Sequence, residues 1–358
     1  MVTSIVAAVV VLGFLILFHE LGHFLVAKRT GVGVLKFSLG FGPKLIGRRI
    51  GRTEYVLSAI PLGGFVKMVG EDPEEEVDPE DQKIAFQHQK LWKRMAIVAA
   101  GPGANILFAF VAFSLVFAIY GARVPSDTAK VGGVIENMPA AKAGLRSGDI
   151  VTSVNGIPID KWDKLSETIR ASGGSTIMLT LQREGTAQQL QVTPEAKPDK
   201  SIFGETLGTA YVIGIERGFD EEKVGVLSAI GMGARQTAWW IETLLISVAK
   251  IFQGRIPAKD IGGPILIVQA AGQQARLGLE YLLNFMAVIS INLGVLNLLP
   301  IPILDGGHFL FFAAEALMRR PLDIRHREIA QQVGLVLLIS LMAFAFYNDI
   351  ARVVHGWG

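Results

Sequence analysis

A polar motif, HELGH at residues 19–23, interrupts an apolar run that begins at about Ser4 and continues beyond the motif. The run is long enough to cross a bilayer, where backbone hydrogen bonds must form inside the segment, so it is constrained to be an α-helix. Positions i and i+4 of a helix share a face, which places His19 and His23 side by side. Ionisable side chains in hydrocarbon are costly unless they bind something. The motif therefore predicts a Zn²⁺ site, with Glu20 as the base that takes a proton from the attacking water.

The composition supports a membrane protein with more than one domain. Of the 358 residues, 51% are hydrophobic and 18% are charged, and the mean hydropathy is +0.43, as expected for a chain with several membrane spans. The net charge of +2 is too small to indicate nucleic-acid binding. The chain has no cysteine, which excludes disulfides and thiolate ligands, so a metal must be held by histidine and carboxylate.

Four apolar segments are long enough to span a membrane, namely 4–26, 95–120, 281–299 and 328–350. The first has no basic residue before it and no small-residue cleavage site after it, so we expect a retained helix rather than a signal peptide. A further segment, 224–252, is apolar but carries Arg235, Glu242 and Lys250. We expect that segment to lie on the outer surface of the membrane or over the helix bundle.

Basic residues predict the orientation of the spans. They flank the C-terminal end of the first span and the N-terminal end of the second, and arginines follow the third. Because such clusters stay in the cytoplasm, the loop 27–94 is expected there and the residues after the second span are expected on the exported side. Within that loop, 31–43 and 55–68 alternate with a period near two, which predicts short β-hairpins beside the metal.

Residues 125–197 have the pattern of a soluble β-rich module. Short strands, a helix at about 160–171 and an Asn155-Gly156 turn follow one another in an order that resembles a bacterial PDZ domain. The resemblance implies a peptide groove in which Val131–Ile135 forms the carboxylate-binding loop and edge strand. The residues expected to bind a peptide there are Gly132, Gly133, Val134 and Ile135. The predicted fold class is a polytopic α-helical membrane protein of about four transmembrane helices with an inserted PDZ-like β-rich domain.

Two further stretches carry polar candidates inside spans. The second span contains GPGAN at residues 101–105, where small residues favour close helix approach and Asn105, a buried amide in need of a partner, is a candidate for facing the metal cleft. The third span runs into NLLPIPILDGG, where Pro300 and Pro302 cannot continue an ordinary helix. Asp305 follows this break and is the candidate third ligand. Asn297, beside the break, is a candidate for holding freed backbone groups of a substrate.

Taken together, HELGH, GPGAN, the PDZ-like module and NLLPIPILDGGH resemble the site-2 protease family, the intramembrane zinc metalloproteases of regulated proteolysis. The resemblance covers essentially the whole chain and is strongest to bacterial members with an exported PDZ domain. It implies that His19, His23 and Asp305 hold one Zn²⁺ and that Glu20 is the general base. Familiar large members carry two PDZ domains, whereas this chain has room for one.

The same resemblance implies the biological setting. Substrates would be single-span membrane proteins, such as an anti-sigma factor already trimmed by an upstream site-1-type protease in a stress response. The enzyme would lie in the bacterial cytoplasmic (inner) membrane, with its active site near the cytoplasmic side. The predicted divisions are 1–120, 121–200 for the PDZ domain, 201–280 for amphipathic or surface helices, and 281–358.

Three alternatives stay open on the sequence. One is a membrane HExxH protease of the heat-shock type, which would take a glutamate from a downstream helix as third ligand. Another is a non-catalytic PDZ adaptor that keeps zinc for structure, although an adaptor has no need of Glu20. A third is a metal or proton transporter, which the single cluster near one membrane face disfavours.

Overall fold

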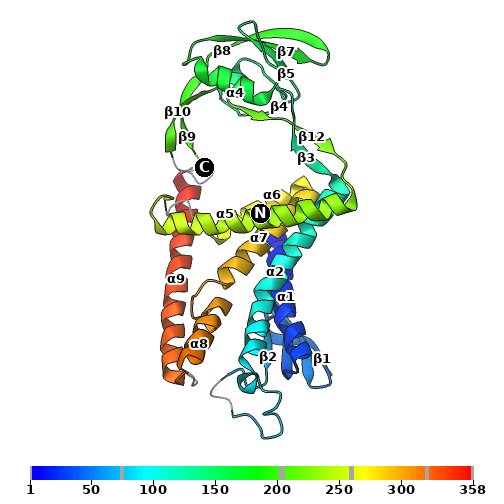
Figure 1. Ribbon diagram of the computed structural model, residues 1–358, viewed down its shortest axis with the longest axis vertical. Coiled ribbons are helices and arrows are strands. Elements are labelled where there is room, and N and C mark those ends of the chain that lie inside the picture. Colours follow the sequence, from blue (N-terminus) through cyan, green and yellow to red (C-terminus); the bar gives the residue numbers. More distant parts are fainter. Residues whose placement is uncertain (1, 73–75, 201–205, 258–261, 319–321, 356–358) are drawn as a thin grey trace. The chain divides into compact units, whose positions relative to one another are not determined.

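The computed structural model describes residues 2–72, 76–200, 206–257, 262–318 and 322–355. The chain forms two compact units. Met1–Ile119 together with Val226–Gly358 make the helical unit, and Tyr120–Gly225 make the β unit. Figure 1 shows the helices and strands of each unit, and the two units are described separately below.

The helical unit confirms the four predicted spans. Among the described residues, four helices are long and apolar enough to cross a membrane: α1 (Val2–Thr30), α2 (Leu91–Tyr120), α7 (Leu279–Asn297) and Arg325–Val354 of α9 (Ile324–His355). The remaining helices are α5 (Val226–Phe252), α6 (Pro264–Leu277), α8 (Asp305–Met318) and the short η1 (Phe86–His88). The helix α8 was not predicted, because the proline break hides the restart of helical structure directly at Asp305.

Small residues bring the spans into contact. A Cβ added at Gly22 of α1 would collide with the carbonyl oxygen of Ala100 in α2, and one at Gly294 of α7 would lie 3.0 Å from the carbonyl oxygen of Pro102. Backbones that approach this closely gain van der Waals contact, which is the main attraction between helices in lipid. Gly22 and Gly294 therefore let α1 and α7 lie close to α2 at the GPGAN segment. Close helix approach at this segment was predicted from its small residues.

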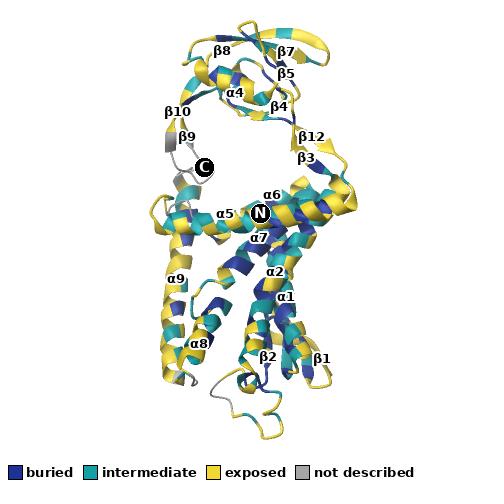
Figure 2. Cartoon of the chain, in the orientation of Figure 1, coloured by how far each residue is buried: buried dark blue, intermediate teal, exposed yellow. Residues whose placement is uncertain are grey.

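The outward faces of the spans are apolar. In α9 the exposed side chains include Val333, Val336, Leu337 and Ile339, and Figure 2 shows the exposed class along most of its length. A water-facing helix would place charge on such a surface, whereas a lipid-facing one has no need of it. This exposure is what a transmembrane location requires.

The helix α5 packs across the other helices rather than alongside them (Figure 1). It is not among the candidate spans of the described chain, and a Cβ at its Gly233 would meet Ser114 of α2. Trp240 and Ile241 pack on the buried cluster that joins α2 and α7. The prediction that 224–252 covers the bundle is consistent with this packing.

The loop between α1 and α2 forms one bent hairpin instead of two separate ones. Its strands β1 (Val34–Ile50) and β2 (Thr53–Met68) pair with each other throughout. Because both strands bend, Glu54–Leu57 pairs with Lys36–Leu39 on one side, and Thr53–Leu57 pairs with Ile46–Ile50 on the other. The prediction of two hairpins was wrong because alternation identifies strands without identifying their partners. The inner half of the hairpin packs, through Phe37, Val66 and Met68, on the cluster that holds Ala27 and Val98.

The β unit has an apolar core under several small antiparallel sheets. Its largest sheet has the strand order β6-β5-β7-β8. Among the described residues, the unit also has three separate two-stranded sheets, β4-β11, β3-β12 and β9-β10. Its elements are β3 (Ala122–Pro125), β4 (Val131–Val134), α3 (Pro139–Lys142), β5 (Ile150–Val154), β6 (Ile157–Pro158), α4 (Trp162–Ala171), β7 (Ile177–Arg183), β8 (Thr186–Val192), β9 (Glu195–Lys200), β10 (Thr206–Val212), β11 (Ile215–Arg217) and β12 (Phe219–Glu222). The core includes Val131, Leu165, Leu179 and Ile213. The order of strands and helices confirms the PDZ-like prediction.

The structure corrects the predicted end of this module. The predicted boundary at residue 200 leaves out β11 and β12, yet these strands pair with β4 and β3, which begin the unit. The compact unit therefore extends to Gly225. A local pattern cannot reveal this closure, because the paired strands lie about eighty to one hundred residues apart in the sequence.

Candidate metal centre

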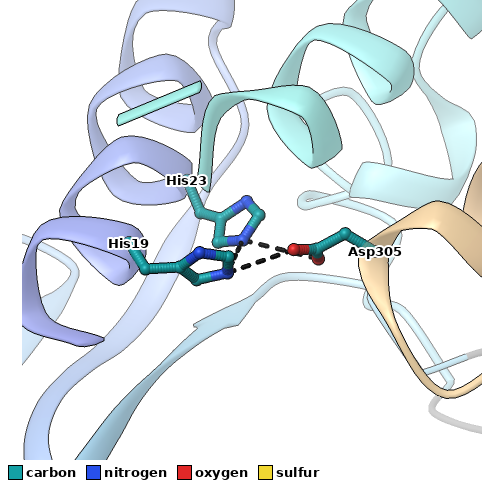
Figure 3. A group of neighbouring side chains, drawn as sticks. All are labelled: His19, His23 and Asp305. Atoms are coloured by element: carbon teal, nitrogen blue, oxygen red, sulfur yellow. Dashed lines mark hydrogen bonds and ion pairs between the residues drawn. The ribbon is translucent and has the colours of Figure 1, made fainter. Parts of the chain in front are cut away.

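Three potential ligands meet where α1 faces the start of α8. His19 and His23 lie on consecutive turns of α1, and Asp305 is the first residue of α8. One ligand atom from each lies within 4.8 Å of the others. The Nε2 atom of His19 is 3.1 Å from Asp305 Oδ2, and that of His23 is 3.5 Å from Oδ1. Figure 3 shows both imidazoles turned toward the carboxylate.

Local sequence explains how Asp305 reaches this point. The chain leaves α7 at Asn297, turns through the two prolines and restarts as a helix at Asp305. A Cβ at Gly306 would collide with the carbonyl oxygens of Leu298 and Leu299. The turn is therefore closed to larger residues, which gives the glycine of the LDG sequence a steric role and fixes the carboxylate at the first helical position.

The two histidines are oriented by different partners. His23 donates from Nδ1 to the backbone carbonyl of Ile97 over 2.8 Å, so a neutral ring keeps its lone pair on Nε2. The Nδ1 atom of His19 lies 3.2 Å from the side-chain amide of Asn105. The two Nε2 atoms are 3.1 Å apart. Each ring thus directs the same nitrogen toward the shared centre.

This geometry fits a tetrahedral zinc ion. Zn–N bonds of about 2.0–2.1 Å at a tetrahedral angle separate two ligand nitrogens by about 3.3 Å, close to the 3.1 Å between the imidazoles. Asp305 Oδ2 is buried and has no hydrogen-bond partner, and such a carboxylate oxygen is costly unless a cation neutralises it. Two histidines and one carboxylate leave a fourth position open, as catalytic zinc sites do.

Space for the ion depends on a residue that sequence reasoning did not single out. A Cβ at Gly101 of α2 would collide with His23 Nε2 and lie 2.7 Å from His19 Nε2. Any larger residue there would occupy the volume next to both ligand nitrogens. The signal in the sequence was present, since Gly101 opens the GPGAN motif, but it was interpreted only as a packing residue.

A cavity of about 840 Å³ connects this centre to more distant residues of the helical unit. Glu20 lines it together with the three potential ligands. Phe65, Val66 and Met68 of β2 form part of its wall, and a Cβ at Gly64 would lie 3.4 Å from Glu20 Cγ. A carboxylate beside an open zinc position, with an extended strand next to it, can serve as a proton carrier for hydrolysis of a peptide held along that strand.

The far part of the cavity carries a charged cluster that the sequence analysis did not identify. Arg94 of α2 donates to Glu315 of α8 over 3.0 Å, and Arg327 of α9 forms an ion pair with the same carboxylate. Arg94 also lies over the ring of Phe312, 4.5 Å from its centroid. Arginines at span ends were interpreted only as orientation signals, and their common partner became visible only with the unpredicted helix α8.

The two asparagines predicted to bind substrate lie away from the cavity wall. Asn105 is fully buried and contacts His19, so in this structure it faces a potential ligand instead of a substrate. Asn297 is half-buried as the last residue of α7. Neither is among the residues that line the cavity, and a substrate role for Asn297 stays a prediction.

The strand predicted to bind a peptide in the β unit is paired along one edge. Val134 and Gly133 of β4 pair with Ile215 and Glu216 of β11. On the other side, Val131 exchanges backbone hydrogen bonds with Gly148 and Asp149. Pairing with β11 therefore removes one edge of β4 from a ligand, and peptide binding by Gly132, Gly133, Val134 and Ile135 stays a prediction. The sheet order leaves β11 with one paired edge among the described strands.

Comparison with known proteins decides the family. The model of peptidase family M50 matches residues 7–341. The chain belongs to peptidase family M50. A Rhizobium meliloti protein is 39% identical over 355 residues, covering 95% of this chain and 94% of that protein. The zinc metalloprotease RasP of Geobacillus kaustophilus is 31% identical over 423 residues, covering 98% of each chain. The regulator of sigma-E protease RseP of Salmonella typhimurium is 33% identical over 449 residues, again covering 98% of each.

The protein is therefore a zinc metalloprotease of the membrane, and its resemblance to site-2 proteases is confirmed. Membership of this family excludes the heat-shock-type and adaptor alternatives. Among solved structures, the PDZ domain of an SdrC-like protein from Listeria monocytogenes matches with 22% identity and a TM-score of 0.21, covering 27% of this chain and 93% of that one. The PDZ-like assignment of the β unit rests on its own strand order.

Proposed function

We propose that this M50 protease cleaves single-span membrane proteins inside the bilayer, at a centre formed by His19, His23 and Asp305 with Glu20 as general base. The observation that supports this most directly is the convergence of those side chains from α1 and α8 inside a unit whose outer faces are apolar. A bound zinc ion supplies Lewis-acid polarisation of the scissile carbonyl and lowers the pKa of water. Glu20 takes the proton of the attacking water and passes it to the leaving amine.

The substrate helix must be unwound before its backbone can react, because helical hydrogen bonds hide the scissile amide. The inner part of β2, Gly64–Met68, pairs with β1 on one side, and its residues Phe65, Val66 and Met68 also line the cavity. An extended substrate segment that adds to this edge would exchange its helical hydrogen bonds for strand hydrogen bonds. We propose that this edge holds the segment next to Glu20.

Substitution of Glu20 tests the function. Glu20→Gln removes the base and keeps the three ligands, so the purified protein should bind zinc normally while losing cleavage of a single-span substrate. Asp305→Ala is the matched comparison, since it should lose both zinc and cleavage. Turnover near the wild-type rate in Glu20→Gln would remove Glu20 from the mechanism, and normal zinc content in Asp305→Ala would remove Asp305 from the ligand set.

We also propose the sidedness expected from the basic residues. The β1–β2 loop and the charged end of the cavity lie in the cytoplasm, and the β unit lies on the exported side of the inner membrane. Reporter fusions in loop 27–94 should be active in the cytoplasm, and fusions within 125–220 should be active outside. A cytoplasmic signal from a fusion at Gln253, at the end of α5, would mean that α5 crosses the membrane.

The β unit acts in this proposal as a gate for substrates trimmed by an earlier protease. A peptide end would add to the unpaired edge of β11, on the side away from β4. The name of the Salmonella relative, regulator of sigma-E protease, supports an anti-sigma factor as the substrate class and a stress response as the setting. Ala122 and Glu222 are paired partners, so residues 123–221 can be replaced by a short linker. The deletion should permit cleavage of untrimmed substrate, and a protein that keeps zinc but cleaves neither form would contradict the gate.

A further inference from the structure

Asn105 is held rigidly at the interface between α2 and α7. Its side chain is fully buried, and its backbone carbonyl accepts a 2.8 Å hydrogen bond from the hydroxyl of Ser290. A Cβ at Gly294 would lie 3.3 Å from the Asn105 Cβ, so α7 packs directly behind it. An amide fixed in this way has few alternative positions, and its hydrogen-bonding contact within the described part of the chain is with Nδ1 of His19, over 3.2 Å.

The two ends of the amide have opposite consequences for His19. If the NH₂ group faces Nδ1, that nitrogen must accept, and the ring proton moves to Nε2, where it blocks the lone pair that a metal needs. If Oδ1 faces Nδ1, that nitrogen donates and Nε2 keeps its lone pair. The placement of oxygen and nitrogen in an amide follows from the hydrogen-bond network, and Oδ1 on the far side is buried without a partner.

The neighbouring histidine indicates which arrangement the centre requires. His23 donates from Nδ1 to the backbone oxygen of Ile97, and a backbone oxygen can only accept. Its Nε2 therefore carries the lone pair. His19 has no such carbonyl partner among the described residues, and Asn105 occupies the equivalent place. Asp305 Oδ2 lies 3.1 Å from His19 Nε2, so the nitrogen that must keep its lone pair for a metal is the one that faces the carboxylate.

We propose that Asn105 is a positioning residue whose Oδ1 accepts the Nδ1 proton of His19 and so fixes the ring tautomer that binds zinc. The inference rests on the ligand set of the proposed function. It gives Asn105 a role behind the metal centre, different from contact with substrate. Loss of a hydrogen-bond partner behind a metal ligand lowers metal affinity by about 10- to 100-fold.

Zinc affinity of the full-length chain in detergent tests the proposal without any substrate. Asn105→Leu keeps the volume and removes the acceptor, and competition with a chromophoric chelator should show zinc affinity about 10- to 100-fold weaker. Asn105→Asp presents an accepting oxygen to His19 in either orientation of the side chain, so its zinc affinity should stay within a few-fold of wild type. Ser290→Ala removes a buried hydrogen bond at the same helix interface without touching an imidazole, and it should bind zinc normally.

The outcomes separate this inference from the ligand assignment. If Asp305→Ala loses zinc while Asn105→Leu binds it as tightly as wild type, Asn105 has no positioning role. If Ser290→Ala weakens zinc as much as Asn105→Leu, the effect is packing and the proposal fails. If Asn105→Leu does not fold, ¹⁵N shifts of the histidine rings in metal-free wild type decide instead, with His19→Ala for assignment. A proton on Nδ1 of His19 supports the proposal, and a proton on Nε2 overturns it.

Discussion

The β unit buries an almost entirely apolar core, whereas the helical unit buries several polar side chains beside its apolar clusters. The buried cluster at the centre of the β unit consists of apolar residues such as Val131, Leu179 and Ile213. The helical unit also has apolar clusters, but it encloses His19, His23, Asn105 and Ser290 and exposes apolar side chains along its spans. Water drives apolar groups inward in the first case, whereas lipid makes no such demand in the second.

The difference shows where function can be placed in each unit. A buried polar group in the β unit must be paired to keep the fold, as Asp149 is with Arg183. In the helical unit, His19, His23 and Asn105 are buried at the candidate metal centre, and glycines such as Gly22 and Gly294 let the helices approach there. We therefore expect substitutions of buried polar or close-packed residues to affect chemistry in one unit and stability in the other.

The largest effect is expected at Gly101. In Gly101→Val the new side chain occupies the space beside His19 and His23, so the protein should lose zinc and proteolytic activity while remaining inserted in the membrane. Gly103→Val is the matched control, because a Cβ at Gly103 has no neighbour within 4 Å. It should keep the metal content of wild type, measured by elemental analysis. Full zinc content in Gly101→Val would contradict the placement of the ion.

A smaller effect, confined to the β unit, is expected at Asp149. Asp149→Asn leaves the Arg183 charge without its partner and should lower the stability of the β unit by about 3 kcal/mol, the low end for a broken buried pair because Arg183 keeps some solvent contact. Hydrogen exchange of β5 and β7 measures this in the full chain. Zinc content should not change, and a coupled loss of zinc would break the division between the units.

The pH dependence follows from the same pair. Burial of Asp149 opposes its ionisation, but hydrogen bonds from Arg183 and from the Arg146 backbone outweigh this, so the pKa of Asp149 lies below its ordinary value. A lowered pKa in the folded state adds stability above the unfolded value of about 3.9, and this stability is lost as the pH falls below it. Exchange protection of the β unit should therefore decrease at acidic pH in wild type, and much less in Asp149→Asn.

The last comparison takes one exposed apolar residue from each unit and includes the smallest expected effect. Leu107 in α2 is 60% exposed and Ile157 in the β unit is 51% exposed. Leu107→Asp places a charge in the middle of a span and should cost about 3 kcal/mol of membrane insertion, whereas Ile157→Asp should change stability by no more than about 0.5 kcal/mol. Membrane-fraction yield and thermal unfolding measure the two. Equal tolerance at both positions would mean that the exposed face of α2 is not in lipid.

Features with a short sequence period could be predicted from the sequence alone. Hydropathy over about twenty residues identified the four spans, because the bilayer fixes the length of a spanning helix. The helical repeat placed His19 and His23 on one face, and the Asn155-Gly156 turn marked a hairpin that the structure contains. Asp305 was a candidate because a proline break preceded it and the centre lacked a third ligand.

Tertiary structure decided which groups meet across the chain. Tertiary packing places β11 along one edge of β4, and the contact of Asn105 with His19 depends on how closely α1 and α2 approach. The volume beside Gly101 has the same origin. A residue pattern reports which face of an element a side chain belongs to, whereas a partner about eighty positions away is chosen by packing. The candidate ligands could therefore be predicted, but their neighbours Gly101 and Asn105 could not be assigned to them.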